Sequence, residues 1–176
     1  QGANPGIQFF LSYYPDIISR GFIHLMLASG GDERTLKQMY FIFPDCLNYV
    51  NDQGIPALHA LSTDHQVACL QIFISDPNVD LDITDPSGRT ALMVFLEKGY
   101  YDLAFTLLEC NRVDWDRKDK KGRTVLHLLA AASSRSRASA SKMSQDTKAN
   151  WISFLVDKVG IFPYLLLYLK LTKPRV

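Results

Sequence analysis

The chain has 176 residues, a formal net charge of +1 and 47% hydrophobic residues. A wholly disordered chain is excluded, because the apolar fraction is high and the net charge is small. The length suits one domain with a sizeable core. Three cysteines, Cys46, Cys69 and Cys110, are odd in number and form no C-x-x-C pair, which argues against a secreted disulfide scaffold. We therefore expect an intracellular protein, cytoplasmic or nuclear.

The charges are unevenly distributed along the chain. Residues 51–111 contain 9 acidic and 2 basic side chains, whereas residues 112–148 contain 4 acidic and 10 basic ones. Such an asymmetry can orient a charged partner, although it does not indicate a fold.

The two ends of the sequence contain no targeting or membrane signal that we can identify. No charged segment precedes an apolar run within residues 1–6, so no secretory signal peptide is predicted. Because the chain has no initiator Met, we expect it to be cut from a longer protein. The most apolar run, Ile161 to Leu171, is about half the ~20 residues that a spanning helix needs, so we predict no membrane insertion.

Self-similarity with a period of 34 residues is the main structural signal. Gly54, Gly88 and Gly122 each begin a similar segment, Gly-Ile-Pro-Ala-Leu-His, Gly-Arg-Thr-Ala-Leu-Met and Gly-Arg-Thr-Val-Leu-His. An aspartate precedes each glycine by two or three positions: Asp52, Asp85 and Asp119. Apolar pairs follow the first two glycines by 19 residues, Phe73-Ile74 and Leu107-Leu108. A fixed period of this length indicates a repeat protein.

The periodicity within one repeat predicts two short helices. Thr90 suits the start of the first helix, where its hydroxyl can accept a hydrogen bond from a free backbone N–H. Leu92, Phe95 and Leu96 then share one helical face, and Leu107 belongs to the facing stripe of the second helix. Because one helix pair buries only one side, neighbouring pairs must stack to complete a core.

These segments resemble the ankyrin repeat, whose consensus begins Asp-x-x-Gly-x-Thr-Pro-Leu-His. The resemblance covers about residues 7 to 160 and implies an all-α solenoid of helix-turn-helix units joined by β-turn finger loops. The sequence departs from the consensus where Ile23 and Pro56 replace Thr, and where Met26 and Met93 replace His. The implied organisation is a single domain over 1–176, with a partial repeat at 7–20, repeats at 21–51, 52–84 and 85–118, a repeat at 119–160 that contains an inserted loop at 133–147, and a capping or truncated repeat at 161–176.

The insertion at 133–147 is rich in Ser, Ala and Arg and has almost nothing to bury. One interpretation is a neutral, solvated loop. The alternative is a switch, since phosphate on Ser134 or Ser136 would cancel the charge of nearby arginines. The apolar segment Ile161 to Leu171 would cap the fourth repeat or begin a fifth; if exposed, it would be an interaction patch.

No catalytic, metal or cofactor site is evident. The resemblance gives His59 and His127 a structural hydrogen-bonding role, and His24 and His65 lack partners at metal-ligand spacing. No nucleophile elbow, P-loop or dinucleotide-binding glycine motif occurs. We therefore expect no enzymatic activity, no cofactor and no bound metal.

By resemblance, the chain is expected to be a non-catalytic protein-binding module of a larger protein. The partner would contact the concave side formed by the finger loops and first helices. The candidate partner-binding residues are Asp85, Ser87, Arg89, Glu97, Lys98, Lys118, Lys120, Lys121 and Arg123.

Two alternatives from other classes stay open. The module could recruit substrates for an enzyme or effector whose catalytic part lies elsewhere. It could also bind anionic lipid or nucleic acid through the basic region 112–148. Nucleic acid is the weaker candidate, because the basic run Arg117 to Lys121 is interrupted by Asp119 and lacks stacking aromatic residues.

Overall fold

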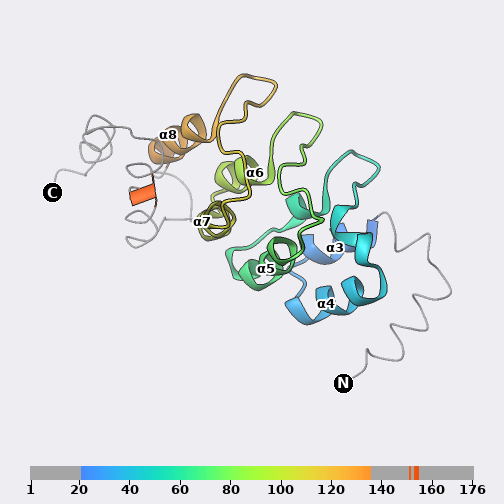
Figure 1. Cartoon of the computed structure of the whole chain (residues 1–176). Helices are drawn as coiled ribbons and strands as arrows, with labels where there is room; N and C mark the ends of the chain where they lie inside the picture. Colours follow the sequence, from blue (N-terminus) through green and yellow to red (C-terminus); the bar gives the residue numbers. More distant parts are fainter. Residues whose placement is uncertain (1–20, 136–150, 152, 155–176) are drawn as a thin grey trace.

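The computed structural model describes residues 21–135, 151 and 153–154 of the chain (Figure 1). The expected partial repeat at 7–20, the insertion beyond Arg135 and the C-terminal segment 161–176 lie outside the described residues.

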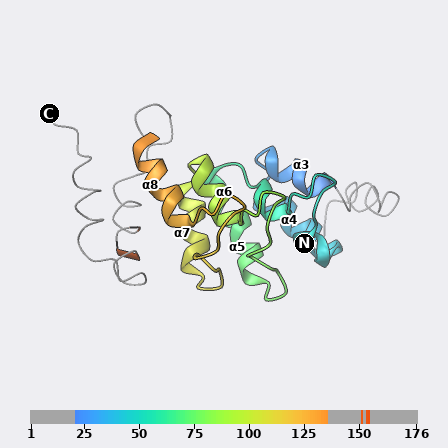
Figure 2. The same cartoon turned by 90° about the horizontal axis from the view of Figure 1, so that it is seen from above.

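The described part of the chain consists of helices and turns, apart from an isolated antiparallel bridge between Val50 and Pro56. The α-helices are α3 (Ile23–Ala28), α4 (Glu33–Ile42), α5 (Val67–Ser75), α6 (Ala91–Lys98), α7 (Tyr101–Glu109) and α8 (Val125–Arg135). Three 3₁₀ helices are also present: η2 (Pro44–Asn48), η3 (Ala57–Ala60) and η4 (Asp64–Gln66). In both views α3, α6 and α8 form one row, which we call the first-helix row (Figures 1 and 2). The helices α4, α5 and α7 form the second-helix row beside it. The predicted all-α solenoid is therefore confirmed.

The pair α6–α7 follows the sequence pattern closely. The Thr90 hydroxyl accepts a hydrogen bond from the backbone N–H of Met93 at the start of α6. Gly99 ends α6 in the left-handed conformation with φ of 84°, and its N–H donates to the Leu96 carbonyl. Because glycine adopts this conformation without strain, the chain can reverse at once into α7.

The first helix of the repeat at 52–84 is shorter than expected, because η3 replaces an α-helix. Pro56 stands at the cap position where Thr is expected, and no side chain caps η3. After Leu61 the chain is extended, and Thr63 with Gln66 forms a capping box that begins η4. Polar side chains that bond to nearby backbone compete with helix formation, which accounts for the early end.

Two other expectations need correction. Gly21, which begins the expected repeat at 21–51, is not among the positive-φ glycines that turn the later repeats; it is π-helical and precedes α3. At the other end, α8 continues to Arg135, so residues 133–135 are helical and not part of the inserted loop. The three alanines at 130–132 have the highest helix propensity, which favours this extension.

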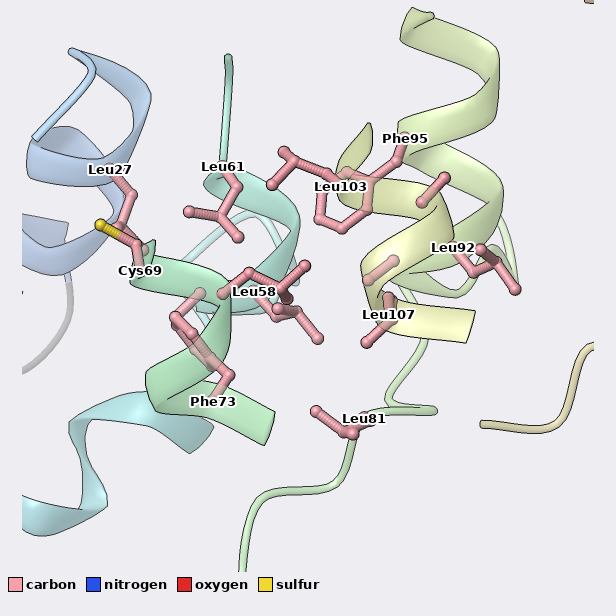
Figure 3. Packing of buried hydrophobic residues seen from close by; sticks show 14 of the residues in the cluster. Leu27, Leu58, Leu61, Cys69, Phe73, Leu81, Leu92, Phe95, Leu103 and Leu107 are labelled. Atoms are coloured by element: carbon pink, nitrogen blue, oxygen red, sulfur yellow. The ribbon is translucent and has the colours of Figure 1, made fainter. Parts of the chain in front are cut away.

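One apolar core runs through the stacked helices (Figure 3). Leu58 lies 1% exposed in η3, Phe73 is fully buried in α5, and Phe95 and Leu107 are fully buried in α6 and α7. The close-up shows these side chains directed towards one another across successive pairs (Figure 3). Each pair therefore completes the core of its neighbour, as the one-sided apolar pattern requires.

An aromatic cluster continues this core beyond α7. The ring of Trp151 lies 5.8 Å from that of Phe105 and 6.3 Å from that of Phe154, in edge-to-face geometry. Phe154 in turn meets Trp115 at 6.4 Å. Edge-to-face pairs at these separations are favourable beyond their burial alone. The helical residues after the insertion thus pack beside α7.

Buried histidines bond to backbone carbonyls, but not at all the positions expected. His59 Nε2 donates to the Ile83 carbonyl at 3.1 Å. His24 Nε2 donates to the Ile55 carbonyl at 2.7 Å, a role that the sequence alignment did not assign to it. His127 is exposed, and its Nδ1 accepts from the backbone N–H and hydroxyl of Thr124. His24 therefore connects its repeat to the next one, His59 bonds to the end of its own repeat just before finger residues 84–90, and His127 supports its own helix start.

We predict that Leu107→Ala lowers the free energy of unfolding by about 2–5 kcal/mol, because it leaves a cavity in the shared core. The matched control is Lys120→Ala on an exposed finger, which should change the free energy of unfolding by at most about 0.5 kcal/mol. Urea unfolding of both variants measures the difference. A Leu107→Ala value near that of the control would contradict the observed packing.

We also predict an acid-dependent loss of stability that depends on His59. Burial lowers the pKa of His59 to about 4, so between pH 6.5 and 4 the unfolded chain binds a proton that the folded chain does not. Stability therefore falls with falling pH in this window, by up to about 1.4 kcal/mol per pH unit. Burial also lowers the pKa of His24, which adds to this slope.

Urea unfolding of wild type, His59→Gln and the exposed control His65→Gln at several values between pH 7 and 5 tests this. The His59 variant should lose about 1 to 2 kcal/mol less than wild type over that range. The control should follow wild type. Equal slopes for the two variants would show that His59 does not limit stability in acid.

Candidate partner-binding surface

Three finger loops project side by side from the helices (Figure 1). We define finger 1 as residues 50–56, finger 2 as residues 84–90 and finger 3 as residues 118–124. Each turns at a glycine with positive φ, 75° at Gly54, 74° at Gly88 and 73° at Gly122. The same backbone hydrogen bond closes each turn, from the glycine N–H to the carbonyl three residues earlier, at 2.8–2.9 Å.

One side chain organises the backbone of each finger. Asp85 Oδ1 accepts hydrogen bonds from the N–H groups of Ser87 and Arg89, both at 2.9 Å. Asp119 does the same in finger 3, at 2.9 and 2.8 Å. In finger 1 the equivalent acceptor is Asn51, not the expected Asp52. The turns are therefore fixed internally, before any partner binds.

Fingers 2 and 3 are joined by a chain of five charged side chains, which we call the clasp: Asp85, Arg89, Glu97, Arg123 and Asp119. Arg89 Nε donates to Asp85 Oδ2 at 2.8 Å, and Arg123 Nε donates to Asp119 Oδ2 at 2.8 Å. Glu97 on α6 accepts from both arginines, at 2.5 Å from Arg89 and 3.2 Å from Arg123. A single carboxylate therefore connects two fingers to the first-helix row.

The clasp carboxylates remain ionised because they are hydrogen-bonded. Burial by itself raises the pKa of Asp85, but hydrogen bonds from Arg89 outweigh it and leave the pKa below its usual value. The pKa values of Glu97 and Asp119 are lowered by the same balance, with Arg123 as a donor to both. The clasp therefore has two positive and three negative charges at neutral pH.

The fingers also touch directly. The N–H of Lys120 donates to the Ser87 carbonyl at 3.0 Å. A Cβ placed on Gly88 would lie 3.2 Å from both Cγ and N of Lys120, and one on Gly54 would lie 2.9 Å from Cγ of Pro86. The three loops are thus packed as a continuous edge, with little room between them.

The structure separates the nine candidate partner-binding residues into two groups. Asp85, Arg89, Glu97 and Arg123 belong to the clasp, and the side chain of Asp85 is only 2% exposed. Ser87, Lys98, Lys118, Lys120 and Lys121 are exposed. The ammonium of Lys98 lies 5.9 Å from the centre of the Tyr100 ring, and its partial desolvation there lowers its pKa although the side chain as a whole is exposed. The second group can reach a partner without dismantling the fingers.

Two arginines of the basic region have structural roles that the spacing did not reveal. The guanidinium of Arg112 donates to four carbonyls at the end of α5 and in the loop after it, those of Ile74, Asp76, Pro77 and Val79. Arg117 Nη1 donates to the Asp82 carbonyl at 2.5 Å. Both bind backbone in the preceding repeat and thereby tie successive units together, so they are less available to a ligand than the sequence suggests.

No metal centre is found in the described part of the chain. Residues 21–135, 151 and 153–154 contain no group of three or more His, Cys, Asp or Glu side chains that could hold a metal ion. The cysteines are free, and burial raises the pKa of Cys46 to about 12. No helix within these residues is long and apolar enough to cross a membrane.

Comparison with known proteins agrees with this geometry. The model of the ankyrin repeats, in three copies, matches residues 23–119. The chain belongs to the ankyrin-repeat family. It is 31% identical over 110 residues to the nuclear factor NF-kappa-B p105 subunit of Gallus gallus, a match that covers 61% of this chain and 11% of that protein. The chain therefore spans only a small part of this curated relative. Ankyrin repeats generally serve as protein–protein interaction modules.

We predict that Gly88→Ala destabilises the protein more than Gly122→Ala does. Both glycines have nearly equal positive φ, so both variants pay about 1–2 kcal/mol of backbone strain. Only at Gly88 does the new methyl group crowd Lys120, since nothing lies within 4 Å of a Cβ on Gly122. Urea unfolding of the two variants measures the finger-to-finger contact as their difference. Equal losses would show that fingers 2 and 3 do not pack as described.

Proposed function

We propose that this ankyrin-repeat chain is a non-catalytic, protein-binding module of a larger intracellular protein. The partner docks on the concave side formed by the fingers and the first-helix row. The observation that supports this most directly is that the side chains that hold the fingers together differ from those that are exposed at the tips. Buried Asp and half-buried Arg side chains hold fingers 2 and 3, which leaves exposed polar side chains at their tips with no part in these ion pairs.

The rigidity of the fingers supports the same proposal. Each turn is closed by backbone hydrogen bonds, and the clasp fixes finger 3 relative to finger 2. A surface that is ordered before binding loses little conformational entropy when a partner arrives. The similarity to a small part of a much longer protein is consistent with a module that serves a larger chain.

Site-specific photo-crosslinking tests the position of the interface. A photoreactive phenylalanine analogue replaces Ser87 at the tip of finger 2, and in a second variant it replaces Phe41 on α4. Phe41 is 80% exposed and belongs to the second-helix row, so it is a matched, accessible control.

In the native cells we expect a discrete protein adduct from position 87 and none from position 41. Adducts from position 41 alone would move the interface to the second-helix row. Adducts from neither position would contradict a protein partner on either face.

A further inference from the structure

The tip of finger 3 has three lysines whose charge is not compensated nearby. Lys118, Lys120 and Lys121 are exposed. The ion pairs found among the described residues involve Lys37, Arg89 and Arg123, and none includes a lysine of this tip. These three lysines are called the tip lysines below.

The one carboxylate within the tip does not neutralise them. Both oxygens of Asp119 are occupied, Oδ1 by two backbone N–H groups and Oδ2 by the Arg123 guanidinium. Its side chain is only 1% exposed. The sequence alternates Lys, Asp and Lys, but in the folded loop the aspartate is inside and the lysines are outside. A mixed-charge run therefore becomes a purely basic surface.

The neighbouring finger is neutral and fixed in place. Pro86 and Ser87 are exposed at the tip of finger 2, beside the backbone of Lys120. An anionic chain that lies across the two tips would meet lysine ammonium groups and a serine hydroxyl, with no exposed carboxylate on either tip. Such a site favours anionic groups such as carboxylates, because each lysine brings three N–H donors and an unpaired charge.

The surroundings restrict the size of the anion. Residues 21–135 contain 11 basic and 15 acidic side chains, so the array that presents the tip is itself acidic. Exposed carboxylates of Asp114 and Asp116 immediately precede the tip in sequence. A broad polyanion such as a membrane surface would be repelled by this acidic array, whereas a short segment can contact the tip alone.

Single-stranded nucleic acid is disfavoured for a separate reason. Proteins that bind it usually stack bases on exposed aromatic rings. The aromatic residue nearest in sequence to the tip is Trp115, and it is half-buried against Phe154. The tip thus offers charge without a stacking platform.

We infer that the tip lysines bind a short acidic peptide segment, rich in Asp or Glu, of the partner protein. This inference rests on the proposed function and specifies the chemistry of the partner. The peptide backbone crosses fingers 2 and 3, its carboxylates pair with Lys120 and Lys121, and Ser87 donates or accepts a hydrogen bond at the edge.

The first experiment uses the full chain and a fluorescein-labelled probe peptide of about twelve residues, half of them Glu, in fluorescence anisotropy. A peptide with Gln at each Glu position is the ligand control. Binding of the Glu peptide should weaken severalfold between about 50 mM and about 200 mM salt, because exposed charges are screened. The Gln peptide should not bind measurably.

Charge-matched variants locate the site. Lys120→Gln with Lys121→Gln should weaken binding of the Glu peptide about fivefold or more. Arg34→Gln with Lys37→Gln removes the same charge from exposed positions on α4 and should leave the affinity within about twofold of wild type. Equal losses in the two double variants would show a non-specific charge effect and would overturn the inference.

Two further probes separate the polyanions. Vesicles of phosphatidylcholine with about 30% phosphatidylserine, and a single-stranded oligonucleotide of about 20 nucleotides, are titrated under the same conditions. The acidic-peptide assignment predicts that the Glu peptide binds most tightly per unit charge. Tighter binding of either alternative probe through Lys120 and Lys121 would overturn it.

The outcome is independent of the crosslinking test. A protein adduct at position 87 without binding of the Glu peptide overturns the acidic-segment inference and leaves the proposed function standing. Binding of the Glu peptide without a protein adduct at either position supports an anion site and contradicts the proposed function.

Discussion

The architecture depends on the stacking of helix pairs that each have an apolar face with no partner of their own. Leu107 and Phe95 are fully buried although the two helices that contain them are short, because the preceding pair covers them. The hydrophobic effect therefore acts mainly between repeats and sets their spacing. Since every finger emerges from such a pair, the spacing of the fingers follows from the packing of the core.

Polar contacts then fix the orientation that stacking leaves adjustable. His24 donates to a carbonyl of the next unit, and His59 donates to the Ile83 carbonyl at the end of its own unit. Arg112 donates to the loop of the preceding unit, and Glu97 joins two arginines. A buried or half-buried polar group is costly unless it is paired, so these contacts disfavour a slipped arrangement. Directional bonds thus complement the non-directional core.

The features that could be predicted from the sequence are those that repeat with the period. Thr90, Leu107 and Gly88 act within one unit, so their roles follow from their position in it. The short helix η3 and the role of His24 could not be predicted this way. Pro56 removes the usual cap, and His24 lies two positions before Met26, which occupies the consensus histidine position. Local departures from the repeat are invisible to an alignment on glycines.

The sequence predicted which charged residues lie on the candidate surface, but not which of them are free to contact a partner. Asp85, Arg89, Glu97 and Arg123 have the charges that recognition often uses, yet they are paired with one another through contacts between elements. The choice of residue explains the division. The planar guanidinium can bind two carboxylates in fixed directions, which suits the clasp, whereas lysine is a flexible and strongly hydrated point charge that suits the solvent-facing tip.

A basic tip on a fixed finger has an energetic consequence for binding. The loop backbone is already held by Asp119 and by the bond from Lys120 to the Ser87 carbonyl. On association, therefore, the lysine side chains supply most of the conformational entropy that is lost on this side. The strength of binding is then governed by how many ammonium groups the partner's anions can reach at once. That number depends on the clasp, because Glu97 sets where finger 3 stands relative to finger 2.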